Sequence, residues 1–472
     1  MSILNILISI LLIRLTILIE KPLFVFELFR HGARGPFSLD SNNKDTFGEI
    51  WDNPEQLTNI GRRMHYILGY RNHKRYVEEL EFLSKRFDPH ELYLISSDVN
   101  RTIESGICHL QGLYPPNDPY AEKINDNQIK FLQPPINITQ NIQKKIDELN
   151  AKKYPLPYSI SSIPFHIYHD LEKRFNVYDS PDCFDTIRPI KEKNLNINQI
   201  KDMVNEFDKK YKESFNLFLN QKGNFSFPNI IDMCDQFTSD YIDGRNLSIL
   251  YKYNININDF SDFCGRVADT DFMYYLYGDE KKEINQMYMS PMLSEMLTYL
   301  KNRINSDITK ENIDKNLNKF SNPKFIMISG HDTTISGLEI FINYTFNKSY
   351  KYIRPTFASN LFFEVYKINN STSSFKEYEV HYIINDILVD KFNLYDFIYN
   401  IEKKLWNKKK ISDFCKFDIK NNDSRTLWII ILSIISFILL VFVIILLIKY
   451  IKKSDQDLSF LELGIGIRND TH

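Results

Sequence analysis

Three short apolar runs, each stopping at a polar cluster, limit what this chain can fold into more than any other feature. They cover residues 23–29, 92–95 and 325–328, and the only charge within them is Glu27. Almost uninterrupted apolar runs of this length are typical of buried strands of a parallel sheet that helices cover on both faces. Ligands bind such sheets beyond the carboxyl ends of the strands. The polar clusters that begin at Arg30, Ser96 and Ser329 are therefore expected to form one shared site.

Helical patterns occupy the intervals between these runs. The predicted helices cover residues 57–86, 102–113 and 336–346, and two later strands are predicted over residues 358–366 and 378–384. Residues 115–322 are polar and helical in character, which predicts a largely helical insertion covering one edge of the sheet. The expected fold is α/β, a mostly parallel central sheet flanked by helices. A chain of 472 residues suits one large composite domain, over residues 21–420, or two domains.

Two apolar segments near the termini predict the compartment. Residues 1–20 suit a signal peptide, although they lack a basic start and a small-residue cleavage site, so that an uncleaved anchor is the alternative. Residues 427–448 carry no charge and are long enough for a transmembrane helix. Lys449, Lys452 and Lys453 follow directly, which predicts a cytosolic tail over residues 449–472. We expect a single-pass type I membrane protein whose main domain is lumenal or extracellular, in a lysosome, in a vacuole or at the cell surface.

The charge and the cysteine content limit which partners, metal sites and disulfides are expected. The formal net charge of −2 gives no reason to expect a nucleic-acid partner. The five cysteines include no CxxC pair and no zinc-ligand spacing, and their odd number leaves one thiol free or intermolecular. Cys108 is the candidate for the free thiol, because it lies in an apolar helical pattern that suits a small buried residue. Weak support for glycosylation comes from sequons at Asn137, Asn224, Asn246 and Asn343.

The first polar cluster contains Arg30, His31 and Arg34. A guanidinium group bonds two oxygens of a phosphate at once, and two arginines in a bend after a strand can converge on one anion. The histidine between them could attack phosphorus and form a covalent intermediate. Gly32 and Gly35 are expected to permit the tight bend. The alternative is a solvated basic turn.

The other two clusters support a phosphate site only in combination with the first. Arg101 opens a predicted helix, whose amino terminus attracts anions, and Ser97 or Asp98 could serve as its cap. His331 and Asp332 could supply a cationic phosphate donor and a proton donor. Alone, such a pair is more often a helix cap. Thr333 and Thr334 are expected to be cap and turn residues.

Taken together, these motifs resemble the histidine acid phosphatase family, the branch of the histidine phosphatase superfamily that includes lysosomal and prostatic acid phosphatases and phytases. The family pattern RHGxRxP stands here as RHGARGP from Arg30, and its distant HD pair as His331-Asp332. LTNIG from Leu57 and SSDVNRTIESG from Ser96, followed by GLYPP, resemble further family stretches. The resemblance covers roughly residues 23–415, and the insertion is matched poorly.

The resemblance implies a role for each matching residue. His31 would be the nucleophile, Asp332 would protonate the leaving group, and the phosphate would be held by Arg30, Arg34, Arg101 and His331. It implies no metal or other cofactor, and an acidic optimum if Asp332 is protonated and His331 charged. The expected partner is a small phosphate monoester, and a homodimer is left open. Cys183–Cys415 and Cys234–Cys264 are one proposal among many possible pairings.

Three alternatives to a general acid phosphatase remain. A phosphatase specialised for inositol polyphosphates would need bases around its rim, for which Lys44, Arg62 and His65 are available, and the expected anchor also allows lysophospholipid phosphates. A mutase or a cytosolic phosphotransfer enzyme is disfavoured by the two apolar segments. A non-catalytic, membrane-anchored binding ectodomain would be expected to have lost some of the catalytic side chains, and all are present.

Overall fold

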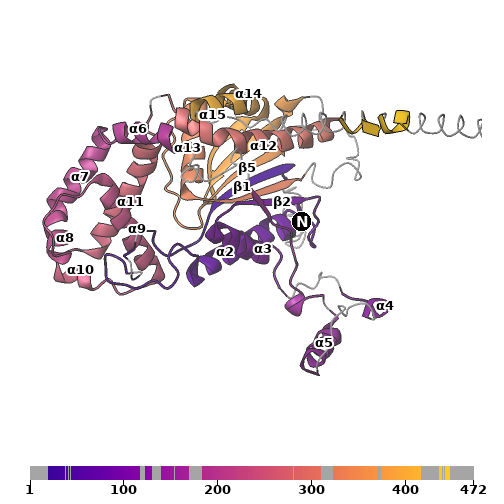
Figure 1. Ribbon diagram of the computed structural model, residues 1–472, viewed down its shortest axis with the longest axis horizontal. Helices are drawn as coiled ribbons and strands as arrows, with labels where there is room; N and C mark the ends of the chain where they lie inside the picture. The colour runs from indigo at the N-terminus through magenta and orange to yellow at the C-terminus, as the bar shows by residue number, and fades with distance from the viewer. Residues whose placement is uncertain are drawn as a thin grey trace, which may run out of the picture. The chain divides into compact units, whose positions relative to one another are not determined.

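The structure of the chain is a computed structural model (Figure 1). It describes residues 20–37, 39–40, 42, 44–116, 123–129, 140–153, 155–168, 183–279, 281–309, 323–368, 374–415, 435–437, 439–440 and 442–446. The chain divides into two compact units, Met1–Lys416 and Phe417–His472. The first unit contains every strand among the described residues.

The centre of the first unit is a seven-stranded sheet with the order β3-β2-β4-β1-β5-β6-β7. Its strands are β1 (Phe24–Arg30), β2 (Leu92–Ser97), β3 (His166–Tyr168), β4 (Phe325–Gly330), β5 (Asn360–Lys367), β6 (Tyr378–Ile384) and β7 (Ile387–Asn393). Strands β3, β2, β4 and β1 run parallel, and β5, β6 and β7 extend the sheet in antiparallel pairs. The three apolar runs are the adjacent strands β2, β4 and β1, which confirms the predicted parallel core. Strand β7, whose outward residues are exposed, was not predicted.

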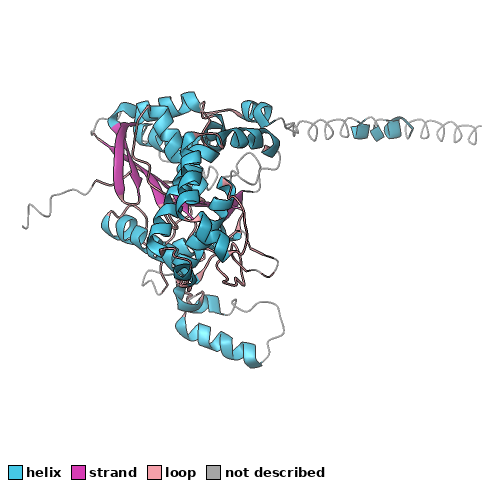
Figure 2. Ribbon diagram, turned by 90° about the vertical axis from the view of Figure 1, so that its left-hand side faces the viewer, coloured by secondary structure: helices cyan, strands magenta, loops and turns pink. Residues whose placement is uncertain are grey.

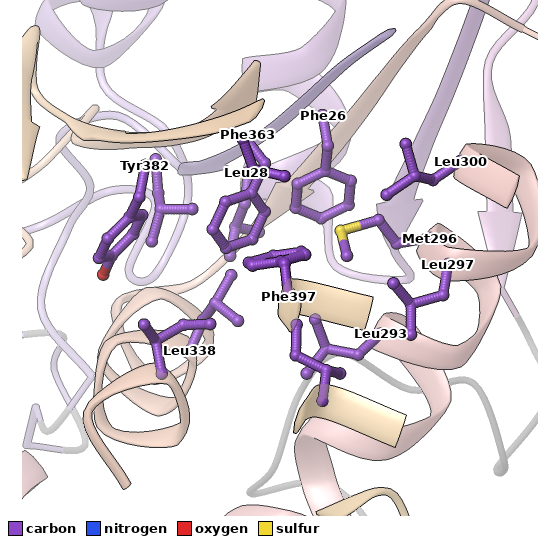
Figure 3. Packing of buried hydrophobic residues seen from close by; sticks show 14 of the residues in the cluster. Phe26, Leu28, Leu293, Met296, Leu297, Leu300, Leu338, Phe363, Tyr382 and Phe397 are labelled. Carbon is purple, nitrogen blue, oxygen red and sulfur yellow. The ribbon is translucent and has the colours of Figure 1, made fainter. Parts of the chain in front are cut away.

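Helices cover both faces of the sheet (Figures 1 and 2). On one face lie α2 (Asn59–Asn72), the π-helix η1 (His73–Glu79) and α3 (Asn100–Leu113), and on the other lie α12 (Glu283–Thr309), α13 (Asp332–Phe346) and α14 (Leu394–Lys404). Strand β1 shows why the run is continuously apolar. Phe26 and Leu28 pack against α12, α13 and α14 (Figure 3), whereas Val25 and Phe29 face α3 and η1. Successive side chains alternate between two buried faces, so neither set can be polar.

The segment between α3 and β4 contributes most of the remaining helices. They are α4 (Asp126–Ile129), α5 (Gln140–Lys152), η2 (Pro157–Ser159), α6 (Phe184–Asn194), α7 (Asn198–Lys210), α8 (Lys212–Phe218), α9 (Phe227–Asp243), α10 (Ile249–Lys252), α11 (Ile257–Thr270) and the π-helix η5 (Asp271–Leu276). Helices α7 to α11 pack around a hydrophobic cluster of their own, rich in phenylalanine. Strand β3 and helix α12 of the same segment join the sheet and one of its covering layers.

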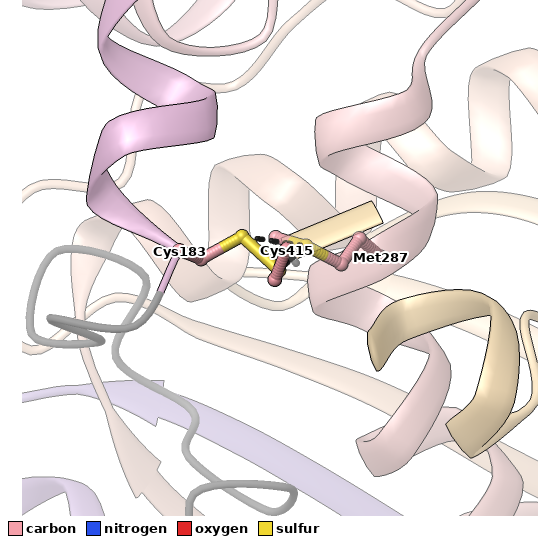
Figure 4. Close-up of a disulfide and its surroundings, with 3 residues drawn as sticks. All are labelled: Cys183, Met287 and Cys415. Carbon is pink, nitrogen blue, oxygen red and sulfur yellow. Dashed lines mark hydrogen bonds between the residues drawn. A yellow bond between two sulfur atoms is a disulfide. The ribbon is translucent and has the colours of Figure 1, made fainter. Parts of the chain in front are cut away.

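Two disulfides link distant parts of this unit. Cys183 at the start of α6 is bonded to Cys415, the last residue of α15 (Lys408–Cys415), and the bridge packs against the sulfur of Met287 (Figure 4). Cys234 of α9 is bonded to Cys264 of α11. Both bridges agree with the proposed pairing, and Cys108 is the free cysteine. It is half-buried rather than buried as expected, because its turn of α3 lies at the edge of the covered face.

The structure gives no support for the roles predicted for the apolar termini and the sequons. Residues 1–19 and most of residues 427–448 lie outside the described part of the chain. Among the residues that the structure describes, no helix combines the length and apolarity needed to cross a membrane. Asn137 is also outside the described residues, whereas Asn224 and Asn246 are exposed. The signal peptide and glycosylation stay predictions.

Candidate active site

The three polar clusters meet at the carboxyl ends of β1, β2 and β4. In the sheet register Arg30 is level with Gly330, and Ser96 is level with Ser329. The rings of His31 and His331, which follow two neighbouring strands, have centroids 5.5 Å apart. Parallel strands end at the same edge, so residues about 300 positions apart in sequence become neighbours.

The surroundings of His31 favour a neutral imidazole with one unprotonated nitrogen. It is 1% exposed, and its Nδ1 lies 2.9 Å from the carbonyl oxygen of Gly32. Because a carbonyl only accepts, Nδ1 carries the hydrogen and Nε2 keeps its lone pair. Burial lowers the pKa of His31 well below its ordinary value, and the nearby charges of Arg30 and Arg101 lower it further. The ring therefore remains a potential nucleophile in mildly acidic solution.

A close contact between two of the sequence motifs holds the loop that carries His31. A Cβ atom on Gly32 would lie 2.4 Å from the carbonyl oxygen of Gly61, and one on Gly61 would lie 2.3 Å from that of Ala33. Neither glycine has a positive φ angle. Gly32 was expected to permit a tight bend, but a bend is not the reason that glycine is required here. What requires glycine is the direct packing of this loop on the first turn of α2.

Arg30 is held on three sides. Its Nη2 lies 2.6 Å from Oδ2 of Asp332, its Nη1 donates to the carbonyl oxygen of Pro355 at 2.8 Å, and its guanidinium lies over the ring of Phe357. The backbone oxygen of Arg30 accepts from Nε2 of His65 at 3.0 Å. Burial lowers the pKa of His65 to about 3, so this residue is a neutral support beneath the site, not a base at its rim.

Arg34 forms a bidentate ion pair that the sequence did not predict. Its Nη2 and Nη1 donate to the two oxygens of Asp235 at 2.7 and 3.1 Å, and Asp235 also accepts from the backbone of Phe37 at 3.0 Å. Arg34 is 2% exposed. Asp235 lies on α9, in the poorly matched insertion, so no local pattern could identify it. It fixes the guanidinium that was expected to bind phosphate.

Replacing Asp235 by alanine is expected to lower the free energy of unfolding by roughly 2–4 kcal/mol, because Arg34 would be left buried and unpaired. Urea denaturation measures this loss. Saturating inorganic phosphate should recover more stability in Asp235→Ala than it adds to the wild type, since phosphate can take the place of the carboxylate. The matched control is Asp202→Ala at an exposed position of α7, which should change stability by no more than about 0.5 kcal/mol. Equal phosphate effects in wild type and variant would contradict the prediction.

Arg101 and His331 border the same site. Arg101 lies in the first turn of α3, is 6% exposed, and places its Nη1 3.6 Å from Glu55. Nε2 of His331 is 2.9 Å from Oγ of Ser97. Neither Ser97 nor Asp98 caps α3, whose N-cap is Val99. Ser97 instead orients His331, so its expected role was wrong.

The surroundings of His331 do not favour the charged form that was expected. Burial lowers the pKa of His331 well below its ordinary value, and the charges of Arg101, Arg30 and Arg34 lower it further. A neutral ring can still donate one hydrogen bond to a phosphate oxygen. Thr334 accepts from the backbone N–H of His331 at 3.3 Å, in agreement with its expected role as a cap and turn residue.

Asp332 is the first residue of α13. Its Oδ2 faces Arg30, as given above, and its Oδ1 accepts from the backbone of Thr333 at 2.8 Å. Its side chain is 21% exposed and lines a cavity of about 960 Å³ that also contains His31, His331 and the three arginines. The sheet edge therefore opens into a space large enough for a small ester.

Of the remaining acidic and basic residues, some line the cavity and others do not. Lys44, Arg62 and His65 do not line it, and Arg62 pairs with Glu104 on the surface. Asp232 and Asp271 of the insertion do line it, although no sequence pattern indicated them. In the described part of the chain, no three His, Cys, Asp or Glu side chains are grouped to hold a metal ion.

Comparison with known proteins places this site in context. The family model of the histidine phosphatase superfamily (branch 2) matches residues 34–385. Prostatic acid phosphatase of Mus musculus is 24% identical over 347 residues, which are 73% of this chain and 74% of that protein. Lysosomal acid phosphatase of Xenopus laevis is 35% identical over 99 residues, 20% of this chain and 22% of that protein. The chain thus spans about three quarters of the mouse protein and about a fifth of the Xenopus one.

Among solved structures, the phytase from Citrobacter braakii superposes with a TM-score of 0.52 at 13% identity. The superposition covers 84% of this chain and 98% of that one. At such low identity the likeness concerns the fold alone, and it agrees with the α/β architecture expected from the sequence.

Proposed function

The chain belongs to branch 2 of the histidine phosphatase superfamily, and from this premise we propose that it is an acid phosphatase that hydrolyses phosphate monoesters through a phosphohistidine at His31. The family supports phosphomonoester hydrolysis in general and confirms the resemblance expected from the motifs. The residue roles and the acid phosphatase activity belong to the proposal.

One observation supports the proposal most strongly. A buried histidine, in surroundings that favour its neutral form, lines one cavity together with three arginines. Three positive charges attract a phosphate dianion and stabilise the charge on its oxygens during transfer. The lone pair on Nε2 supplies the nucleophile that such a phosphate requires.

The first step transfers the phosphoryl group to the enzyme. Nε2 of His31 attacks phosphorus, a nitrogen–phosphorus bond forms, and the bond from phosphorus to the ester oxygen breaks. Asp332, in its protonated form, gives a proton to that oxygen, which leaves as an alcohol. Arg30, Arg34, Arg101 and a hydrogen bond from His331 hold the phosphate oxygens.

The second step releases phosphate. Water attacks phosphorus and gives one proton to the carboxylate of Asp332. The nitrogen–phosphorus bond breaks, and inorganic phosphate departs. His31 and Asp332 return to their original protonation states, so the cycle balances without a metal or a redox cofactor.

Hydrolysis of p-nitrophenyl phosphate by the purified protein, in the presence of a chelator, tests this proposal. We expect turnover to persist at about pH 5, below the ordinary pKa of histidine. The lowered pKa of His31 means that the ring loses its proton at lower pH and stays nucleophilic there. A folded protein without turnover, or an activity that falls in parallel with protonation of an ordinary histidine, would contradict the proposal.

The compartment is part of the same proposal. Two disulfides suit a lumenal or extracellular domain, because the cytosol keeps thiols reduced. One curated relative is named for the lysosome, which supports the same compartment for this chain. Membrane attachment through residues 427–448 and a homodimer stay predictions from the sequence.

A further inference from the structure

The cavity has two chemically different walls. The sheet edge supplies the histidines and the three arginines described above. The insertion supplies a second wall, whose lining residues include Ile231, Asp232, Ile242, Val267, Asp271 and Phe272. We call these six residues the insertion wall. When phosphate lies at the sheet edge, the leaving group of an ester must occupy the space in front of the insertion wall, because both walls enclose one cavity.

Asp271 is the unusual residue of the insertion wall. It is 8% exposed, and among the described residues its Oδ1 has no hydrogen-bond partner and its carboxylate forms no ion pair. Buried carboxylates without such partners are rare in proteins that do not use them. A buried acceptor on the wall of a substrate cavity is suited to bind a polar group of the ligand.

The part of the cavity in front of the insertion wall has no unpaired basic residue among the described residues that line it. Beyond the sheet-edge cluster, the only basic residue among its described lining residues is Arg354. Nε and Nη2 of Arg354 each donate to the carboxylate of Asp269 at 2.8 Å. The two opposite charges of this ion pair leave no net charge. A second phosphate or a carboxylate on the leaving group would therefore face Asp271, and Lys191, which interacts with Asp271, does not line the cavity. An ammonium group on the leaving group would instead form an ion pair with the carboxylate of Asp271.

We propose that Asp271 is a specificity-determining residue, which favours phosphate monoesters whose apolar or aromatic leaving group carries an ammonium group and disfavours those that carry a second anion. This inference rests on the proposed function and assigns the substrate class of the same site. It agrees with the observation that Lys44, Arg62 and His65, the bases available to bind an inositol polyphosphate, do not line the cavity.

The charge of Asp271 depends on pH, which makes the inference testable without a variant. Burial raises its pKa to about 7, Lys191 of α6 opposes this shift, and Asp332 of α13 and Asp232 of α9 add to it. Tyr275 and Tyr277 also interact with it electrostatically. A raised pKa means that Asp271 is neutral in acid and becomes negative as the pH rises through about 7.

Three phenyl phosphates test the inference, bearing a para-propyl, a para-aminoethyl or a para-carboxyethyl group. Their phenol leaving groups are similar, so changes in the catalytic groups largely cancel in ratios of kcat/KM. At about pH 8 we expect the ammonium ester to exceed the carboxylate ester roughly tenfold, with the neutral ester between them. At about pH 5, where Asp271 is protonated, this span should shrink to about threefold.

In Asp271→Asn the span at about pH 8 should fall to its value at about pH 5, because the amide has the same shape and no charge. Asp259→Asn, an exposed carboxylate of α11 outside the cavity, should retain the wild-type span. A span that is independent of pH in the wild type would overturn the inference, even if Asp271→Asn failed to fold. Hydrolysis of none of the three esters would instead reject the proposed function.

Discussion

Replacing His31 by alanine is expected to reduce the turnover of p-nitrophenyl phosphate by about 10⁴-fold or more, the scale on which loss of a covalent nucleophile acts. The arginines and His331 would still bind phosphate, but Nε2 of His331 is 2.9 Å from Oγ of Ser97, so we do not expect His331 to replace the nucleophile. The effect should therefore fall on kcat and leave phosphate binding largely intact.

Two measurements distinguish loss of the nucleophile from loss of the fold. Quenching the wild type during turnover of a radiolabelled ester should leave label on the protein that is stable to base and labile to acid, as phosphohistidine is, and His31→Ala should carry none. Inorganic phosphate should still raise the melting temperature of the variant. The matched control is His90→Ala at an exposed loop position, which should keep full activity. Residual turnover within tenfold of the wild type would rule out His31 as the nucleophile.

Replacing Asp332 by asparagine is expected to slow the reaction by an amount that depends on the leaving group. For an alkyl phosphate, whose alkoxide is a strong base, loss of the general acid should reduce kcat/KM by roughly 10²- to 10⁴-fold. For p-nitrophenyl phosphate the loss should be at least tenfold smaller, because nitrophenolate leaves without a proton.

This dependence separates the two contacts of Asp332. The residue also pairs with Arg30 at 2.6 Å, and loosening that arginine would weaken phosphate binding for every ester alike. An equal loss for alkyl and nitrophenyl esters would therefore assign Asp332 to positioning of Arg30 and not to proton transfer. Measuring kcat/KM for both esters, in wild type and variant at the same pH, decides between the two roles.

Local patterns in the sequence were enough to predict the sheet core and the place of the site. The runs that became β1, β2 and β4 are local signals, because a strand buried on both faces needs apolar residues at every position. Since parallel strands end at one edge, His31, Arg101 and His331 could be placed together before any coordinates. The sequence left the disulfide pairing open, because five cysteines allow many pairings, and the structure confirms the one that was proposed.

The surroundings of these residues depend on how elements that are distant in the sequence pack together. Asp235 and Arg34 are 201 positions apart, and the sequence around Asp235 is that of an ordinary amphipathic helix. Asp271, the first residue of η5, likewise lines the cavity as a buried acid only because the insertion packs beside the residues of the sheet edge. The neutrality of His331 and the steric need for Gly32 depend on burial and on contacts within a few ångströms. Such properties arise from the docking of distant elements, and no local pattern of residues encodes them.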